Sequence, residues 1–556
     1  RSTTLDERVN SEETWGARAA ATLLLNDRVT WDLAYDYIDS DRTTLGFLPF
    51  DPDFRTRTGL QLTDCGSSII DTFLNEQKGN CSNIQTGGIT SNLSWELDWA
   101  TLNVITGYRS TEQSFALDFQ IGPNTAGPLG GFMIANEVEH DQFTQEIKLV
   151  GNADRLSWVA GAFYLYEDST TDALDSFGFA TAFPLGLLLG HKRLENETDS
   201  LAVYLQGDYR LTDSLELTLG GRYTDETKEV DFTSLIRDSY PASFIPAFAP
   251  PNLLPTSENM VAAGIPLKQD ETQFSPRLAL TYTVNDDLLF FASATNGFKS
   301  GGWNARANSA PLNSDFGPEE AWSYELGMKS EWLDGNLRFN LTGYFLDVQD
   351  LQVLSGFESP TGIEFLTQNA ADLEAMGLEF EIAYAPLASL EFFVNGSVSD
   401  GGEYKNIPPL LGAGGVPCSA TPEPLNCTTE GDEPVRFPEQ QVNAGVRYAV
   451  PVGAGELVFN GALSYQSSYW SSTYNDLATV TGIPVNSDTP VTADFSETGD
   501  TTMVNIGATY AAPDEQWTAS LECQNCSDEY FFTSSLAGTG YPVLPRWVNF
   551  RVRYNF

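Results

Sequence analysis

Long stretches of this chain alternate between apolar and polar residues with a period of two. In the clearest stretch the apolar positions are Leu201, Val203, Leu205 and Tyr209. The polar positions between them are Tyr204, Gln206, Asp208 and Arg210. Successive side chains of a strand point to opposite faces, so the pattern predicts strands with one apolar and one polar face. The same alternation returns in residues 215–223, 337–345 and 457–465.

Short turns rich in Asn, Asp, Gly and Pro join these strands in pairs. Nine are expected, at Asn26-Asp27, Asp98, Asn152-Asp154, Thr212-Asp213, Asn285-Asp287, Asp334-Gly335, Pro386, Val452-Gly455 and Pro513-Asp514. The segments between one pair and the next are much longer. Short turns on one side and long loops on the other are typical of an outer-membrane β-barrel, whose short turns are periplasmic. We therefore predict an all-β, antiparallel transmembrane barrel.

A soluble sandwich with one buried face is the alternative. Many segments exceed 12 residues, which is long for a soluble strand. Polar faces that carry Arg210, Arg222 and Arg277 suit a water-filled interior. Aromatic residues at predicted strand ends suit interfacial girdles. They are Trp31, Tyr35, Trp158, Tyr344, Tyr469 and Trp470. These features favour the barrel.

The strand count predicts where the chain starts. Nine turns and a last strand give about 19 strands, and the first, Thr14 to Leu25, must run toward the turn side. Residues 1–13 would then be the remnant of an extracellular loop, and residues 14–556 the barrel. Because such barrels have even strand numbers, we expect one or three further strands before Arg1, which gives about 20 or 22 in all. The sequence contains no run of 18 or more apolar residues, so it predicts no transmembrane helix.

The chain is strongly acidic, with Asp+Glu 76 against Lys+Arg 29 and a formal net charge of -47. This argues against nucleic acid or anionic lipid as partners, because both require a positive surface. A Ca²⁺ site at Asp36, Asp39 and Asp41 is possible in principle, but no Asp-x-Asp-x-Asp-Gly loop supports it. We expect a solvated acidic exterior and no metal site or cofactor.

Six cysteines form three pairs that are close in sequence: Cys65 with Cys81, Cys418 with Cys427, and Cys523 with Cys526. Six cysteines allow about 15 connectivities, and proximity favours these three. Disulfides in loops imply an oxidising compartment. The spacing Cys523-Gln524-Asn525-Cys526 also occurs in redox and zinc motifs, but no further ligands lie nearby in the sequence.

Catalytic motifs are absent from the sequence: there is no HExxH, GxSxG or P-loop. A hydrolytic site at the barrel rim would have to use His140, expected at the outer rim of a strand, or His191, expected in a loop. We expect no enzyme, and this hydrolase remains the least favoured alternative.

Several motifs of the C-terminal half resemble TonB-dependent outer-membrane receptors. In family order these are Asn296-Gly297-Phe298-Lys299-Ser300-Gly301-Gly302-Trp303-Asn304, Pro318-Glu319-Glu320, residues 323–330, residues 333–337, Gly377-Leu378-Glu379, and Asn525-Cys526-Ser527-Asp528-Glu529-Tyr530-Phe531. The last is similar to the family's penultimate-strand motif, with Cys where Leu is usual. The terminal strand, which includes Tyr554 and ends on Phe556, resembles the signal read by the barrel-assembly machinery.

This resemblance implies an active importer of a scarce solute, with ferric siderophore as the default cargo. It implies a plug domain and a TonB-binding box, neither of which this sequence shows, and an inner-membrane energising complex as partner. A passive diffusion channel is the main alternative. The outer membrane of a Gram-negative bacterium is the expected location.

Ligand capture would fall to inward-facing loop and rim residues. Aromatic rings stack on flat or sugar-like ligands, and Arg binds carboxylate or catecholate oxygens. The candidates are Trp303, Asn304, Arg306, Tyr469, Trp470, Tyr474, Phe532 and Tyr541. Each could instead belong to the aromatic girdle or pack loops together. Gly297, Gly301 and Gly302 are expected to allow the backbone to bend or to approach closely where a strand gives way to a loop.

Overall fold

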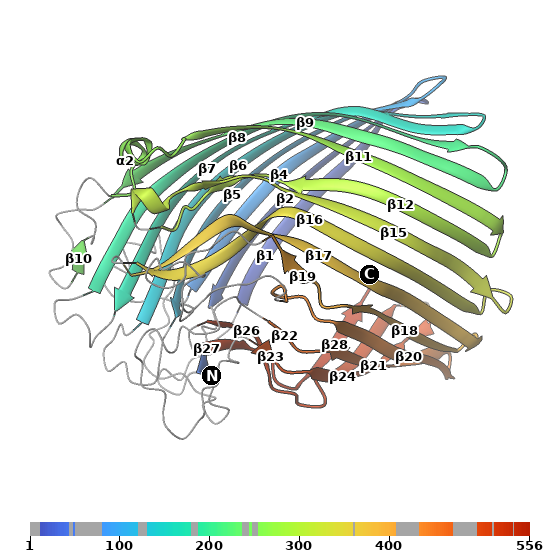
Figure 1. Cartoon of the computed structure of the whole chain (residues 1–556). Helices are drawn as coiled ribbons and strands as arrows, with labels where there is room; N and C mark the ends of the chain where they lie inside the picture. The colour runs from blue at the N-terminus through green and yellow to red at the C-terminus, as the bar shows by residue number, and fades with distance from the viewer. Residues whose placement is uncertain are drawn as a thin grey trace.

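A computed structural model of the chain describes residues 12–43, 48–49, 81–119, 131–178, 187–235, 244–246, 254–307, 309–359, 362–406, 433–470, 497–513, 516–536 and 539–555. Nearly all of them form one strongly curved sheet of tilted antiparallel strands (Figure 1). In this part of the chain no helix has the length and apolar character needed to cross a membrane.

The main sheet has 21 strands. Nineteen of them pair antiparallel in chain order: β1 (Glu12–Asn26), β2 (Val29–Thr43), β4 (Cys81–Glu96), β5 (Thr101–Phe119), β6 (Gly131–Ala153), β7 (Leu156–Gly178), β8 (Leu187–Arg210), β9 (Leu215–Ser234), β11 (Lys268–Asn285), β12 (Leu288–Lys299), β15 (Glu319–Trp332), β16 (Leu337–Ser359), β17 (Gly362–Leu387), β18 (Leu390–Ser399), β20 (Gln440–Val452), β21 (Gly455–Gln466), β24 (Thr501–Ala511), β25 (Trp517–Gln524) and β28 (Trp547–Tyr554).

The remaining elements are short and lie on the long-loop side. β10 (Phe244–Pro246) pairs parallel with β8, and β19 (Glu403–Lys405) pairs antiparallel with β17. Three small sheets contain β13 (Gly302–Trp303) with β14 (Asp315–Phe316), β22 (Tyr469–Trp470) with β23 (Glu497–Thr498), and β3 (Leu48–Pro49) with β26 (Phe532–Leu536) and β27 (Thr539–Pro542). Among the described residues the helical elements are α2 (Ser257–Ala262) and the 3₁₀ turn η2 (Ala310–Leu312).

Short turns join consecutive strands at one end of the sheet at or beside the nine predicted positions, although Asp514 of the last one lies outside the described residues. The described residues contain the predicted 19 strands in one consecutive antiparallel order. The turn after β15 contains Leu333, Asp334 and Gly335, all with positive φ, as expected for the Asp-Gly pair. One position was wrong in detail. Leu387 pairs with Leu390, so the turn lies at Ala388-Ser389 and Pro386 belongs to the end of β17.

The direction of β1 also agrees with the sequence. β1 begins on the long-loop side and ends in the short turn at Asp27-Arg28. β28 runs the same way, so these two strands cannot pair antiparallel with each other. No ladder joins them within the described residues. Residues 1–11 lie outside the description, and the domain boundaries and preceding strands remain predictions.

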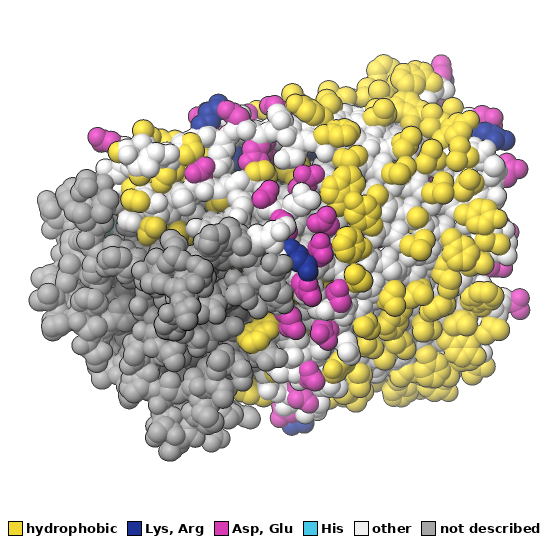
Figure 2. Space-filling view, viewed as in Figure 1, with side chains coloured by type: hydrophobic (Ala, Val, Ile, Leu, Met, Phe, Trp, Pro, Cys, Tyr) yellow, Lys and Arg dark blue, Asp and Glu magenta, His cyan; other side chains and the backbone are white. Residues whose placement is uncertain are grey.

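The outer face carries an apolar band near the short turns. On β11 it runs through Phe274, Leu278, Leu280 and Tyr282, all of which are exposed. This nine-residue stretch matches the length that a tilted strand needs to cross hydrocarbon, about 9–11 residues. Figure 2 shows hydrophobic side chains covering the turn-side part of this surface, with Asp and Glu along the border toward the loops.

The inner face is polar over the same height. Arg109 forms two 3.0 Å hydrogen bonds with Asp36, and Tyr204 donates to Glu146 at 2.6 Å. Arg222 lies on this face too, 5.4 Å from the ring centre of Phe163. An outward apolar face and an inward polar face are what a barrel in lipid requires, so the soluble sandwich is wrong.

The girdle prediction holds for part of its residues. Tyr35 faces outward and is exposed, and Trp158 stacks on Trp99 with ring centres 6.0 Å apart. Tyr344 was assigned wrongly, because it faces inward and lies over Gly377 of β17. Tyr469 and Trp470 belong to the small β22–β23 pair, beyond the main sheet.

Aromatic rings cover glycines of neighbouring strands at several places. A Cβ added to Gly161 would lie 2.5 Å from the Tyr204 hydroxyl and 2.9 Å from the carbonyl oxygen of Ile147. The ring therefore fills space that only a glycine leaves free, and each such pair defines the register of two strands.

We predict that Gly161→Ala destabilises the barrel by about 1–3 kcal/mol, because the backbone oxygen of Ile147 cannot move away cheaply. Urea unfolding of the protein in detergent micelles measures this. Gly507→Ala is the control, since its methyl group would meet other atoms only at 3.6 Å or more. Equal unfolding midpoints for the two variants would contradict the packing argument.

Candidate functional site: a crossing segment on the inner wall

Residues 300–318, which connect β12 to β15, form an ordered element that we call the crossing segment. Asn308 within it lies outside the description. The segment contains β13, η2 and β14, and it contacts strands on both sides of its own hairpin. Three of the predicted ligand residues, Trp303, Asn304 and Arg306, belong to it.

One side of the crossing segment is bonded to β9 and β11. Lys228 Nζ donates to the carbonyl oxygen of Gly301 at 3.0 Å, and Gln269 Nε2 donates to Gly302 O at 3.3 Å and Phe316 O at 3.2 Å. A Cβ at Gly301 would lie 2.5 Å from Phe316 O. The predicted close approach is thus confirmed for Gly301. Gly297 has nothing within 4 Å of an added Cβ, so no close approach requires a glycine there.

The other side is bonded to β16 and β17 through side-chain amides. Asn304, which is 5% exposed, donates from Nδ2 to Ser314 O and Thr367 O, and its Oδ1 accepts from Thr367 N at 2.6 Å. Gln352 Nε2 donates to Ser300 O at 2.9 Å, and Asn369 Oδ1 accepts from Gly317 N at 2.7 Å. Asn304 therefore fastens the segment to β17.

Trp303 packs into a small hydrophobic cluster. The cluster consists of Val230, Phe232, Met260, Ile265 and Ala310, contributed by β9, the α2 region and η2. The indole Nε1 of Trp303 donates to Pro266 O at 2.7 Å. The side chain thus connects the α2 region to the crossing segment, while its role toward a ligand remains a prediction.

Arg306 lies at the far end of the segment, against β6, β7 and β8. Its Nη2 donates to Asn136 Oδ1 at 3.3 Å and lies 3.7 Å from Asp175 Oδ1. Lys192 Nζ lies 3.8 Å from Asp175 Oδ2 and donates to Ala307 O at 2.8 Å. Lys192 and Asp175 are each 3% exposed, whereas the Arg306 side chain is 38% exposed. The cluster holds two cations against one carboxylate, and Arg306 is its accessible member.

Two carboxylates face each other beneath the Gly301 contact. Glu226 and Glu271 are direct cross-strand partners, on the loop side of the apolar band. Burial raises the pKa of the Glu271 carboxyl; Lys228 opposes the shift, Glu226 adds to it, and the N–H of Gly301 opposes it. Lys228 also lies 3.3 Å from Glu226. The ammonium group of Lys228 thus interacts electrostatically with both Glu226 and Glu271.

The other predicted ligand residues are only partly described. Tyr469 and Trp470 are half-buried in β22, where the backbone of Tyr469 bonds to the Thr498 hydroxyl. Phe532 and Tyr541 lie in the paired strands β26 and β27, with side chains outside the description, and Tyr474 lies outside the described residues altogether. Their roles stay predictions.

The residues considered for a hydrolytic site or a Ca²⁺ site do not lie together in the structure. His140 faces inward on β6, with Nε2 3.7 Å from Glu167. His191 is buried within β8, so its placement in a loop was wrong. Asp36 faces inward onto Arg109, whereas Asp39 and Asp41 face outward; the three cannot share a Ca²⁺ ion. Among the described residues no acidic, His or Cys cluster could hold a metal.

The predicted Cys523–Cys526 disulfide is present and links the end of β25 to the turn that follows it. Cys81 is disulfide-bonded too. Its predicted partner Cys65 and the pair Cys418 and Cys427 lie outside the described residues.

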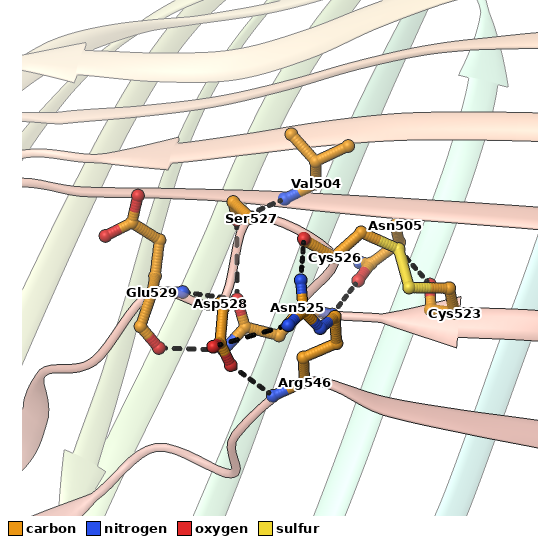
Figure 3. The surroundings of a disulfide bond; sticks show 9 residues. All are labelled: Val504, Asn505, Cys523, Asn525, Cys526, Ser527, Asp528, Glu529 and Arg546. Carbon is orange, nitrogen blue, oxygen red and sulfur yellow. Dashed lines mark hydrogen bonds and ion pairs between the residues drawn. A yellow bond between two sulfur atoms is a disulfide. The ribbon is translucent and has the colours of Figure 1, made fainter.

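Figure 3 shows Asn525, which has a φ of 47°, beside the Cys523–Cys526 bridge. Its N–H donates to Asn505 Oδ1 and its Nδ2 to the carbonyl oxygens of Glu529 and Leu544. Asn525, the first residue of the motif at residues 525–531, therefore connects the end of β25 by hydrogen bonds to β24 and to the segment that precedes β28. Phe556 lies outside the description, so the assembly signal remains a prediction.

We predict that Asn304→Ala frees the crossing segment without unfolding the barrel. The buried partners at Thr367 and Ser314 lose their bonds, which destabilises this contact by about 1–3 kcal/mol. Hydrogen exchange should speed up in residues 309–318 and 366–370 only. Asn336→Ala, in an exposed turn, is the control. Unchanged protection in the Asn304 variant would show that the amide does not hold the segment.

We predict that Glu271→Gln raises the thermal midpoint at about pH 8 and leaves it unchanged at about pH 4. Because the pKa of the Glu271 carboxyl is higher in the folded state than its ordinary value of 4.5, protonation of this group stabilises the folded state below pH 4.5. That stabilisation is lost as the pH rises through the folded-state pKa. Gln removes the charge that causes the loss. Glu13→Gln, exposed on β1, is the control. A lower midpoint for Glu271→Gln at about pH 8 would mean that Lys228 overcompensates the burial.

Comparison with known proteins agrees with this architecture. Residues 20–526 match the family described as TonB dependent receptor-like, beta-barrel. The ferric yersiniabactin uptake receptor FyuA from Yersinia pestis superposes with a TM-score of 0.72 at 14% identity, over 99% of this chain and 71% of that one. The siderophore receptor PiuA from Acinetobacter baumannii gives 0.68 at 15% identity, over 98% and 74%.

Sequence relatives match over shorter stretches. The metal-pseudopaline receptor CntO of Pseudomonas aeruginosa is 28% identical over 116 residues, which is 21% of this chain and 15% of that protein. The ferripyoverdine receptor of the same species is 26% identical over 153 residues, 27% and 14% of the two chains. These matches thus span about a seventh of each curated relative. From the family match and the fold together, the chain belongs to the TonB-dependent receptors and is a β-barrel of the Gram-negative outer membrane.

Proposed function

We propose that this chain forms the barrel of a receptor that takes up an anionic metal chelate, most directly a ferric siderophore. The relatives named above are receptors for metal–pseudopaline, ferripyoverdine and ferric yersiniabactin, which supports this class of cargo. The family is one of transport receptors, so no catalytic step is proposed. Transport would be energised by TonB through a plug and a TonB-binding box.

Arg306 carries the proposal. A chain with a net charge of -47 repels anions over most of its surface. The Arg306 side chain is partly exposed on the inner wall, and its guanidinium contacts Asp175 and Asn136. A planar guanidinium can bind two oxygens of a carboxylate or catecholate at once. The crossing segment would thus present a fixed positive group to an anionic chelate entering from the loop side.

The anchoring of the segment supports the same role. Amide side chains from β11, β16 and β17 fix its backbone, so Arg306 lies on a rigid element. A binding group that is already ordered loses less freedom on capture. Tyr469, Trp470, Tyr474, Phe532 and Tyr541 are proposed to add ring contacts.

We predict that Arg306→Ala weakens binding of ferric carboxylate and catecholate complexes by about 10-fold to 100-fold, the loss of one or two charge-assisted bonds. Arg306→Lys, which keeps the charge without the planar fork, should lie between. Titration of the purified receptor with a panel of ferric chelates measures this.

Arg338→Ala is the matched control, because Arg338 also faces inward but pairs with Glu381 near the short turns. Equal affinities in all variants would remove Arg306 from the site. Binding of an uncharged chelate alone, insensitive to Arg306, would contradict the proposed cargo class.

A passive diffusion channel is the second candidate, and the polar inner wall is the observation that favours it. Single-channel conductance in planar bilayers separates the two functions. A receptor whose lumen is plugged conducts little, whereas a diffusion pore conducts steadily and needs no energising partner.

A further inference from the structure

Asp175 of β7 is a buried carboxylate that lies between two cations, Arg306 of the crossing segment and Lys192 of β8. A buried carboxylate is costly unless it is paired and hydrogen-bonded. Neither cation reaches hydrogen-bond distance, because Arg306 Nη2 lies 3.7 Å from Oδ1 and Lys192 Nζ lies 3.8 Å from Oδ2. Within the part of the chain that the structure describes, Asp175 Oδ1 accepts no hydrogen bond. Two cations therefore share one carboxylate, and neither is bound closely to it.

The same two strands contain a closely bound arginine–aspartate pair for comparison. Asp172 and Arg193 are direct cross-strand partners on the outward face of β7 and β8. Arg193 donates from Nε to Oδ1 at 2.6 Å and from Nη2 to Oδ2 at 2.8 Å, so the carboxylate occupies the guanidinium fork. Arg306 has no such partner among the described residues, and its guanidinium donates only to Asn136 Oδ1, at 3.3 Å. The fork of Arg306 is thus open to another pair of oxygens.

The two cations beside Asp175 differ in what they can reach. Lys192 is 3% exposed and donates to Ala307 O at 2.8 Å, so its ammonium stays within the wall. The Arg306 side chain is 38% exposed and accessible from the interior of the barrel. Only Arg306 can therefore exchange its partner for a ligand, while Lys192 remains beside the carboxylate.

The cost of such an exchange depends on the charge that is left behind. Removing the single partner of a buried carboxylate leaves an uncompensated charge and is strongly unfavourable. With Lys192 in place, Arg306 can leave and a pair of one cation and one carboxylate remains. The backbone of the crossing segment stays anchored, and only the guanidinium changes its partner.

We propose that Lys192 is the counter-ion that releases Arg306. It neutralises Asp175 while the Arg306 guanidinium turns to two oxygens of an anionic ligand. Lys192 is then a positioning residue, because it does not touch the ligand. The identity of the ligand as an anionic metal chelate rests on the proposed function, whereas the release of Arg306 can be measured without any chelate.

The proposal predicts a specific order among variants. In Lys192→Met, Asp175 has Arg306 as its remaining cation and should hold it closely. In the double variant Asp175→Asn/Lys192→Met, the carboxylate is gone too, so Arg306 should be free again. A purely structural role of Lys192 predicts no such recovery, since the bond to Ala307 O is lost in the single and the double variant alike.

Chemical labelling of the full chain in detergent micelles tests the release. Phenylglyoxal modifies accessible guanidinium groups, and mass spectrometry of peptides gives the labelling rate of each arginine. We expect Lys192→Met to slow the labelling of Arg306 about fivefold or more, within the range of coupling between groups in contact. The double variant should label at least as fast as the wild type. Arg338, which pairs with Glu381 near the short turns, is the internal reference and should not change.

A second variant keeps the test available if Lys192→Met does not fold. Lys192→Gln removes the charge but retains an N–H donor for Ala307 O, and it should slow the labelling of Arg306 as well. Equal labelling of Arg306 in the wild type and in the Lys192 variants would overturn the proposal. Slow labelling that persists in the double variant would overturn it too, and would identify Lys192 as an anchor of the segment only.

Titration of the same proteins with iron(III) citrate and an iron(III) tris-catecholate separates this proposal from the proposed function. Affinity should fall about tenfold in Lys192→Met and recover in the double variant. If the labelling order holds but neither chelate binds the wild type, the release of Arg306 stands and the proposed cargo class fails. If chelates bind through Arg306 while its labelling is insensitive to Lys192, the proposed function stands and the counter-ion role fails.

Discussion

Every backbone N–H and C=O group that faces hydrocarbon must find its partner in a neighbouring strand, because lipid supplies none. That requirement explains most of this molecule. It forces consecutive strands into one continuous antiparallel ladder from β1 to β28, and it makes the short turns tight. It also permits only one division of side chains, apolar toward the lipid and polar toward the interior, which the period-two alternation supplies.

The ladder frees the loop side for function. Strands such as β8 and β17 contain 24 and 26 residues, although about 9–11 suffice to cross the hydrocarbon. Their loop-side ends form walls beyond the membrane, and the crossing segment is bonded to these walls. Its anchors are side-chain amides and two lysines, Lys192 and Lys228, rather than a large core, so its position depends on specific polar contacts. These contacts also determine the position of Arg306.

The sequence predicted the strands and turns, because these depend on residues that are close together in the chain. Turn residues such as Asp334-Gly335 and the alternation in residues 201–209 depend on neighbours in sequence, and both predictions were confirmed. Asn304 shows the limit. Its partner Thr367 is 63 residues away, and nothing near either residue indicates the pairing. The inward position of Tyr344 and the burial of His191 were missed similarly, since each depends on register and on packing across strands. A signal did exist for Gly301, whose glycine-rich setting indicated close approach.

The most direct test of the account is the environment of adjacent side chains on one strand. Leu205→Cys and Gln206→Cys, each carrying a fluorophore in the receptor embedded in a bilayer, should respond in opposite ways. Brominated lipid should quench the label at position 205, and a water-soluble quencher should reach position 206. Equal quenching of both labels by the same reagent would contradict a sheet with one face toward lipid and the other toward water.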